Sequence, residues 1–165
     1  IHKFIPSREG CNTRSRHYIT ASHMDDLFVQ GAISATLLAE VVARLHSRTT
    51  AGAHSIFLGQ VRADETSAGP VTAIHYTAYE DMAREKAAEI SAAVVADYQL
   101  ELLEIYHSLG TVKTGEISLL VLACSQHSRA AIEACAAAVE RLKKELPVWG
   151  QELTDQDASF WKVNT

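Results

Sequence analysis

The sequence predicts an α+β fold in which helices pack against an antiparallel sheet. Segments with helical periodicity alternate with apolar segments typical of strands, in the order α, β, β, α, β, β, α before a polar tail. The strands come in two consecutive pairs, which favours antiparallel pairing within each pair. With 165 residues, the chain is long enough to bury one substantial core.

The composition is that of an ordinary globular protein. Hydrophobic residues make up 47% and charged residues 21%, and no apolar run approaches the ~20 residues that span a bilayer. No secretory signal pattern is present, and three cysteines do not indicate a disulfide framework. A net charge of −5 disfavours bulk nucleic-acid binding. We therefore expect a cytoplasmic protein that binds neither membranes nor nucleic acid.

The first 23 residues differ from the rest, because they are polar and basic and show little periodicity. The tripeptide at residues 22–24 (SHM) resembles a cloning remnant before a native start. We expect residues 1–23 to be a tag or a disordered extension and residues 24–165 to form a single domain. A native N-terminal extension is the alternative.

The first half of the domain begins with a helix. Ser34 is placed to cap it, Gly52 ends its signal, and its apolar positions recur at helical spacing: Ile33, Leu37, Leu38, Val41, Val42 and Leu45. Residues 53–61 predict a strand, 62–70 a polar loop and 71–79 a second strand. Residues 80–98 predict a second helix with one apolar stripe.

In the second half, residues 100–109 predict a strand and 110–116 a hairpin connection. Residues 117–124 (ISLLVLAC) predict a central strand buried on both faces. The helix at 128–146 is ended by Pro147, and 148–153 predicts a short strand before a polar tail. Cys135 is expected on the buried stripe of that helix, with Ile132, Val139 and Leu142.

The junction between that central strand and the last helix is the first candidate site. A helix N-terminus presents unpaired N–H groups and a positive dipole end, which together bind phosphate or carboxylate. His127 and Arg129 would add side-chain donors there. In the alternative interpretation Ser128 only caps the helix and His127 is an ordinary surface residue.

Lysines stand at the other end of the same helix. Lys143 and Lys144 suit the C-terminal dipole for structural reasons alone. A functional role requires one lysine aimed into a pocket, where burial could let it act in proton transfer. The basic stretch 128–144 indicates a small anionic ligand or an acidic partner tail, the alternative being a solvated helix face.

Arg62 is the third candidate, since an arginine at a strand end beside a loop suits bidentate contact with an anion. No Gly-rich phosphate loop, nucleophile elbow or dinucleotide fingerprint occurs. Cys124, His127 and Cys135 match no zinc spacing, so no metal site and no cofactor are expected.

Taken together, these residues resemble the molybdopterin synthase large-subunit family. The resemblance runs from about Gly52 to Glu152 and rests on motifs in the family's order: GA at 52–53 with FLGQVR at 57–62, YTAYEDMA at 76–83, HSLG at 107–110 with GE at 115–116, EAC at 133–135 with RLK at 141–143, and PVW at 147–149.

The resemblance implies an α/β-hammerhead-like fold and a homodimer that receives two ubiquitin-like small subunits. The small subunit would carry a C-terminal thiocarboxylate into the active site. Two sulfurs would then pass to cyclic pyranopterin monophosphate, forming the dithiolene of molybdopterin. Both the phosphate and the partner tail are anions, as the basic candidate site requires.

Carried over by position, the resemblance implies Lys143 as the catalytic residue, with Arg62 and His127 holding the pterin phosphate. Other implied pocket residues are Gln60, Val61, Ser128, Arg129, Lys144, Gly150, Gln151 and Glu152. Three positions depart from the family, because Ser108 and Ser128 replace arginines and Gly150 replaces a lysine. Arg129, Lys144 or a residue of the dimer mate are candidates for compensation.

Three hypotheses follow. The leading one is an active sulfurtransferase. The second is a degenerate paralogue that binds pterin or carrier without efficient turnover, which Gly150 favours. The third is a plain α+β dimerisation domain whose basic residues are surface charge. The first two require Arg62, His127 and Lys143 to converge in one pocket.

Overall fold

The computed structural model describes residues 27–155 and 159–161, so the extension expected at residues 1–23 lies outside the described part. The helical elements are α1 (Ala35–Arg44), a 3₁₀ turn η2 (Leu45–Ser47), α2 (Glu80–Tyr98) and α3 (Ser128–Glu145). The strands are β1 (Phe28–Gln30), β2 (Ala53–Gln60), β3 (Glu65–Thr66), β4 (Gly69–Ala78), β5 (Leu102–Lys113), β6 (Ile117–Ser125), β7 (Val148–Thr154) and β8 (Ser159–Trp161).

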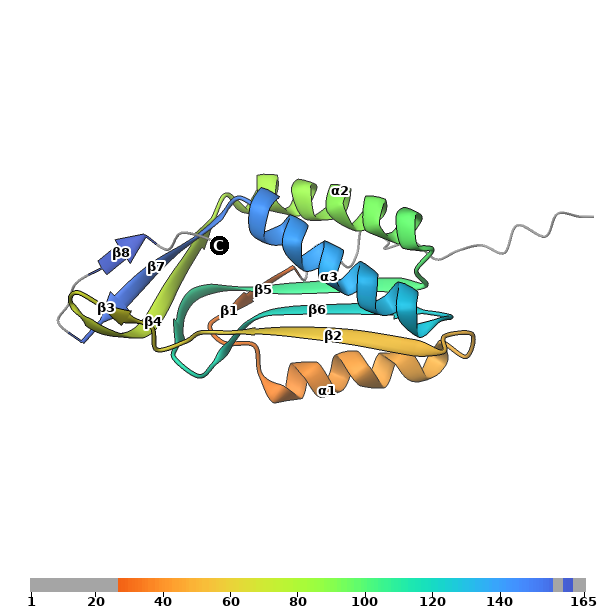
Figure 1. Ribbon diagram of the computed structural model, residues 1–165, viewed down its shortest axis with the longest axis horizontal. Coiled ribbons are helices and arrows are strands. Elements are labelled where there is room, and N and C mark those ends of the chain that lie inside the picture. Colours follow the sequence, from red (N-terminus) through yellow and green to blue (C-terminus); the bar gives the residue numbers. More distant parts are fainter. Residues whose placement is uncertain (1–26, 156–158, 162–165) are drawn as a thin grey trace, which may run out of the picture.

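The strands form one sheet in the order β2-β6-β5-β4-β7-β8, with β1 beside β5 and β3 beside β4. The pairing is antiparallel throughout except between β1 and β5. Helices α2 and α3 lie on one face of the sheet, and α1 lies on the other (Figure 1). The predicted α+β class, with helices packed on a mainly antiparallel sheet, is confirmed.

Strand β5 connects the two parts of the sheet. Residues 102–107 pair with β6, and the last four residues pair with β4. The partner changes near Gly110, whose φ of +78° is a conformation that residues with a side chain rarely adopt. The strand predicted to end at residue 109 continues to Lys113, because Gly110 is a bend within the strand and not a break.

The predicted pairing of the strands at 53–61 and 71–79 is wrong. Strand β2 pairs with β6, whereas β4 pairs with β5 and β7. The connection between β2 and β4 contains β3, which folds back onto the start of β4 and directs that strand into the other part of the sheet. Strands β1, β3 and β8 were not predicted, since elements of two or three residues leave no periodic pattern.

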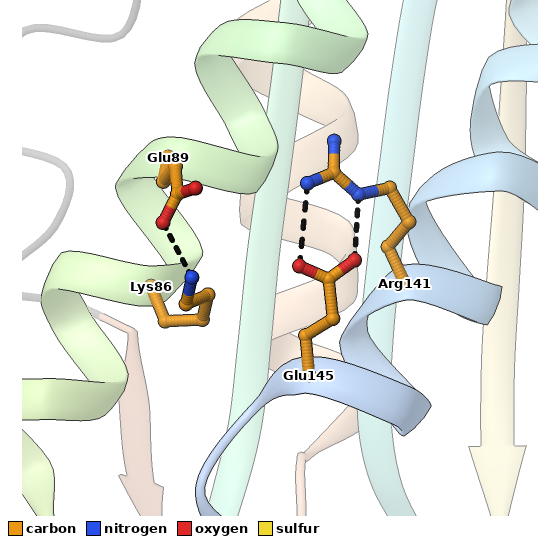
Figure 2. Close-up of polar contacts among 4 residues, drawn as sticks. All are labelled: Lys86, Glu89, Arg141 and Glu145. Carbon is orange, nitrogen blue, oxygen red and sulfur yellow. Dashed lines mark hydrogen bonds and ion pairs between the residues drawn. The ribbon is translucent and has the colours of Figure 1, made fainter.

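The helices begin and pack largely as their patterns predict. Ser34 caps α1, and its hydroxyl accepts a hydrogen bond from the Leu37 amide at 3.1 Å. Small buried residues let α2 and α3 lie close to the sheet and to each other: Ala83, Ala87, Ala131, Ala134 and Ala138. In the ion pairs shown in Figure 2, both partners belong to the same helix. Figure 2 shows Lys86 with Glu89 on α2 and Arg141 with Glu145 on α3.

Ile132 corrects the predicted buried stripe of α3. Cys135, Val139 and Leu142 are buried as expected, but Ile132 is 61% exposed. Its neighbour Ala131 faces the core, and successive helical residues point ~100° apart. Ile132 therefore lies on the rim of the buried face instead of at its centre.

A partly buried cluster of polar and charged side chains joins α1 to the sheet. The Glu104 carboxylate, on β5, accepts hydrogen bonds from the Arg44 guanidinium at 2.8 Å and the Tyr106 hydroxyl at 2.9 Å. Arg44 also donates to the Tyr106 oxygen at 2.7 Å. The hydrogen bond to Glu104 raises the pKa of Arg44 above its usual value.

Among the described helices, none has the length and apolarity that crossing a membrane requires.

Replacing two isoleucines that differ in burial should change the free energy of unfolding by different amounts. Ile90 is fully buried between α2 and the sheet, so Ile90→Ala should lower the free energy of unfolding by about 2–5 kcal/mol. Ile132→Ala is the matched control and should change it by no more than about 0.5 kcal/mol, because the side chain is mostly exposed. Urea denaturation of both variants measures the difference, and equal losses would contradict the placement of α3.

Candidate functional site

The residues predicted for the site fall at two ends of the sheet. Gln60 ends β2 opposite Ile117, where β6 begins, and Arg62 follows directly. The last turn of α3, which holds Lys143, leads into β7 at the same end of the molecule (Figure 1). Gly150, Gln151 and Glu152 are on β7. One group of predicted residues therefore gathers at this end, which we call the lysine end.

His127, Ser128 and Arg129 lie at the opposite end, where α3 begins and Ala53 of β2 pairs with Ser125 of β6. At ~1.5 Å per residue, His127 and Lys143 are about 24 Å apart along the helix axis. A single chain thus does not bring Arg62, His127 and Lys143 into one pocket, contrary to the requirement set by the sequence.

At the start of α3, which we call the histidine end, the chain forms an open cavity of about 400 Å³. It is lined by Asp97, Tyr98, Gln99, Ser125, Gln126, His127, Arg129, Ala130 and Glu133. His127 is the N-cap residue and no side chain caps the helix, so the alternative in which Ser128 is the cap is wrong. The first N–H groups of α3 are therefore left for a ligand or for water.

Arg129 does not take the place of the family arginine that Ser128 replaces. Its guanidinium is hydrogen-bonded to Glu133, one turn further along the same helix, at 2.6 Å. This bond raises the pKa of Arg129 above its usual value. Arg129 is thus directed along α3, and His127 with the helix N-terminus remains the candidate anion-binding feature here.

At the lysine end, the positive charge of α3 is partly neutralised by its own glutamates. Arg141 makes two hydrogen bonds to Glu145, at 2.9 and 3.3 Å (Figure 2). These hydrogen bonds lower the pKa of the Glu145 carboxyl group and raise the pKa of the Arg141 guanidinium. Lys143 and Lys144 are both exposed in the last helical turn, so the burial expected for a catalytic lysine is not supplied by this chain alone.

The three residues at the end of β2 have different environments. The Arg62 side chain is 75% exposed and pairs with Asp64 at 3.0 Å, and Gln60 is also exposed. Val61 is buried, its amide donates to the Glu116 carbonyl, and its own carbonyl accepts from the Gly115 amide. Val61 is therefore an anchor for the strand end, and its contact with a ligand stays a prediction.

The structure gives a steric reason for glycine at position 150. Gly150 pairs with Tyr76 on β4. A Cβ atom there would lie 2.9 Å from Ile74 Cγ2 and 3.3 Å from Tyr76 Cε1, so one of these side chains would have to move. The space that a side chain at position 150 would need is occupied by the Tyr76 ring and Ile74.

An open aromatic pocket beside this strand has no counterpart in the sequence-based predictions. It has a volume of about 430 Å³ and is lined by Thr77, Ala78, Tyr79, Trp149 and Trp161. Tyr79 and Trp149 contact edge to face with their centroids 5.2 Å apart. Tyr79 is 68% and Trp161 66% exposed. The burial of Val148 turns Trp149 outward, and only the placed strand reveals this.

The cysteines of the described part are structural. Cys124 and Cys135 are buried free thiols, and burial raises the pKa of Cys124 to about 11. A protonated, buried thiol is a poor nucleophile and a poor metal ligand. No cluster of three or more His, Cys, Asp or Glu side chains with metal-binding geometry occurs within residues 27–155 and 159–161.

Comparison with known proteins identifies the family. The model of the MoaE protein family matches residues 32–145. Over 122 residues the chain is 37% identical to the molybdopterin synthase catalytic subunit of Pyrococcus abyssi, covering 74% of this chain and 80% of that one. The rice subunit (Oryza sativa subsp. indica) is 38% identical, covering 69% and 58%, and the Drosophila grimshawi subunit is 36% identical, covering 68% and 32%. The chain thus spans only part of the longer eukaryotic relatives.

Solved structures agree with this assignment. Molybdopterin synthase from Staphylococcus aureus superposes with a TM-score of 0.71 at 25% identity, covering 82% of this chain and 95% of that one. The complex of subunits 1 and 2 of molybdopterin-converting factor from Helicobacter pylori contains a chain with a TM-score of 0.69 at 22% identity, covering 81% and 87%. The hypothesis of an unrelated dimerisation domain is therefore discarded, and the chain belongs to the MoaE family, whose named relatives are catalytic subunits of molybdopterin synthase.

Proposed function

We propose that this chain is the catalytic subunit of a molybdopterin synthase in the cytoplasm. It takes sulfur from the thiocarboxylated C-terminus of a ubiquitin-like carrier and transfers it to cyclic pyranopterin monophosphate. The observation that carries this proposal is the similarity to catalytic subunits over about three quarters of the chain, with Arg62, His127 and Lys143 kept at their motif positions.

The degenerate paralogue is not kept as a second candidate. Its one support was the lysine missing at position 150, and that glycine has a local explanation in Tyr76 and Ile74. The relatives that the chain matches are named as catalytic subunits.

The complete site is proposed to form between two copies of the chain. Strand β2 lies at one edge of the sheet, and α3 packs above it. If two β2 strands pair antiparallel about a two-fold axis, each histidine end meets the lysine end of the other copy. The ~24 Å that separates His127 from Lys143 within one chain is thereby bridged by the partner copy.

The surface of β2 supports this pairing. Ile56 and Leu58 are 41% and 39% exposed on the face of the sheet that α1 leaves open, and Val42 of α1 is exposed on the same side. An unprotected outer strand with apolar side chains favours association with another strand. A second copy would cover these residues and complete the pairing of the β2 backbone.

Within such a composite site, Lys143 is proposed to lie against the carrier's thiocarboxylate. Its ammonium group would stabilise the negative charge that develops as sulfur leaves the acyl group. Arg62, together with His127 and the α3 N-terminus of the partner copy, would hold the substrate phosphate. Gln60, Gln151 and Glu152 would line the lysine end around Gly150.

The carrier's folded part is proposed to dock on the aromatic pocket. Exposed aromatic side chains are typical centres of protein–protein interfaces. Trp149 precedes Gly150 on β7, and successive strand residues point to opposite faces. A carrier docked on Trp149 would lie beside β7. The carrier's C-terminal tail would then follow β7 past Gly150 toward the lysine end.

The central test is a single-turnover reaction of the purified chain with thiocarboxylated carrier and cyclic pyranopterin monophosphate. We expect molybdopterin to form, measured after oxidation to a fluorescent derivative. Carrier binding without product would instead support the degenerate paralogue.

A subunit-mixing experiment tests the composite site. Lys143→Ala and His127→Ala should each reduce activity severely, because every site in either homodimer lacks one group. Co-expression of the two should restore about a quarter of parental activity, since half the dimers are mixed and each of these has one intact site of two.

Co-expressed Lys143→Ala and Arg62→Ala chains are the matched control. Both residues come from the same chain in the proposed geometry, so each site of a mixed dimer lacks one of them and activity should stay low. Restoration in the control, or none with His127→Ala, would contradict pairing through β2.

Replacement of Trp149 tests carrier docking. Trp149→Ala should raise the dissociation constant of the carrier by at least about tenfold, as expected for a central aromatic residue. Ile132→Ala removes an exposed apolar side chain from α3, away from the aromatic pocket, and should leave binding unchanged. Calorimetric titration with the carrier measures both, and equal affinities would exclude the aromatic pocket as the docking site.

A further inference from the structure

A chain of polar contacts joins three strands beneath the end of β2. The Tyr76 hydroxyl on β4 donates to Ser118 Oγ on β6 at 3.2 Å. Ser118 Oγ in turn donates to the carbonyl oxygen of Gly59 on β2 at 3.4 Å. Residues from distant parts of the sequence thus meet at Gly59, directly before the segment Gln60-Val61-Arg62 that leaves the sheet.

Ser118 lies where the pairing of β2 with β6 is irregular. Gly59 is opposite Leu119 and Gln60 is opposite Ile117, so Ser118 is the residue that the register skips. Such a bulge bends a strand pair and redirects the side chains that follow it. Ser118 is buried, so its hydroxyl depends on Tyr76 and Gly59 for its hydrogen bonds.

Close packing leaves little freedom on the β2 side of the bulge. A Cβ atom at Gly59 would lie 3.1 Å from Leu119 Cβ and 3.3 Å from Phe57 Cε1. Beyond the bulge, Val61 is anchored by both of its backbone groups and by its buried side chain. The direction in which Arg62 leaves the sheet is therefore set by the bulge and by Val61.

Tyr76 is itself held on two sides. Its ring contacts the His107 ring edge to face, with the centroids 5.2 Å apart. On the other side it occupies the space that glycine leaves at position 150. Burial is the main cause that raises the pKa of Tyr76, which keeps the phenol protonated and able to donate to Ser118.

We propose that Tyr76 is a positioning residue, whose hydroxyl acts through Ser118 to hold the bulge and thereby aims Arg62 at the anionic substrate. Gly150 belongs to the same arrangement, since only a residue without a side chain leaves the Tyr76 ring undisturbed. This inference rests on the proposed function, because it assigns the substrate contact to Arg62.

The test compares two Tyr→Phe substitutions, each of which removes one phenolic hydroxyl, at different places in the fold. Tyr76→Phe keeps the ring and removes the hydrogen bond to Ser118. Tyr106→Phe removes a buried hydroxyl bonded to Glu104 on the opposite, α1-covered face. Thermal denaturation first establishes that both variants fold, and steady-state kinetics with saturating carrier then gives KM for the pterin and kcat.

We expect Tyr76→Phe and Ser118→Ala to raise KM by about 3–10-fold, the factor that one net hydrogen bond supports, with kcat changed less than about twofold. Tyr106→Phe should leave both constants unchanged. In the Arg62→Ala background, Tyr76→Phe should have no further effect, because its influence passes through Arg62.

Two results would overturn the inference. One is an unchanged KM in Tyr76→Phe while Arg62→Ala raises it. The other is the same rise in KM whether or not Arg62 is present, which would mean that Tyr76 acts independently of Arg62.

A separate readout distinguishes failure of the proposed function from failure of this inference. If Arg62→Ala leaves KM unchanged, Arg62 does not bind the pterin, and hydrogen exchange at the Val61 amide then decides. Faster exchange in Tyr76→Phe than in Tyr106→Phe supports a bulge held by Tyr76. Equal exchange in the two variants overturns it.

Discussion

The course of β5 through both parts of the sheet is the constraint on which the rest of the structure depends. Its first half is hydrogen-bonded to β6 and its last residues to β4, and the positive φ of Gly110 allows the change of partner. This single strand places β4 and β7 beside the end of β2. The contact between Tyr76 and Ser118, and the position of Gly150 opposite Tyr76, follow from that placement.

The length of α3 has the opposite effect, since it separates residues that the proposed chemistry needs together. A straight helix of 18 residues holds its two ends ~25 Å apart whatever the side chains are. The expectation that His127 and Lys143 share one pocket assumed that a single chain supplies the whole site. The proposed two-fold axis beside β2 would reconcile a rigid helix with a compact active site, because it would reverse the direction of the second α3.

Elements with a periodic sequence pattern could be predicted, whereas the surroundings of individual side chains could not. Helices α2 and α3 and the buried strand β6 are long and periodic, and their positions agree with the prediction to within one or two residues. Ile132 was misplaced because a stripe read from spacing does not reveal where the buried face is centred. Arg129 was considered as a substitute donor, but its partner Glu133 becomes evident only once both side chains are placed.

By itself, the sequence determined the order of the longer elements, the family and the positions that carry the motif residues, because periodicity and motif spacing are properties of neighbouring residues. Tertiary structure alone decided which strands pair, which aromatic side chains remain exposed, and which side chains crowd the space beside Gly150. Each of these depends on atoms brought together from distant segments, as the Tyr76 ring over Gly150 shows. A contact of that kind leaves no trace in local sequence.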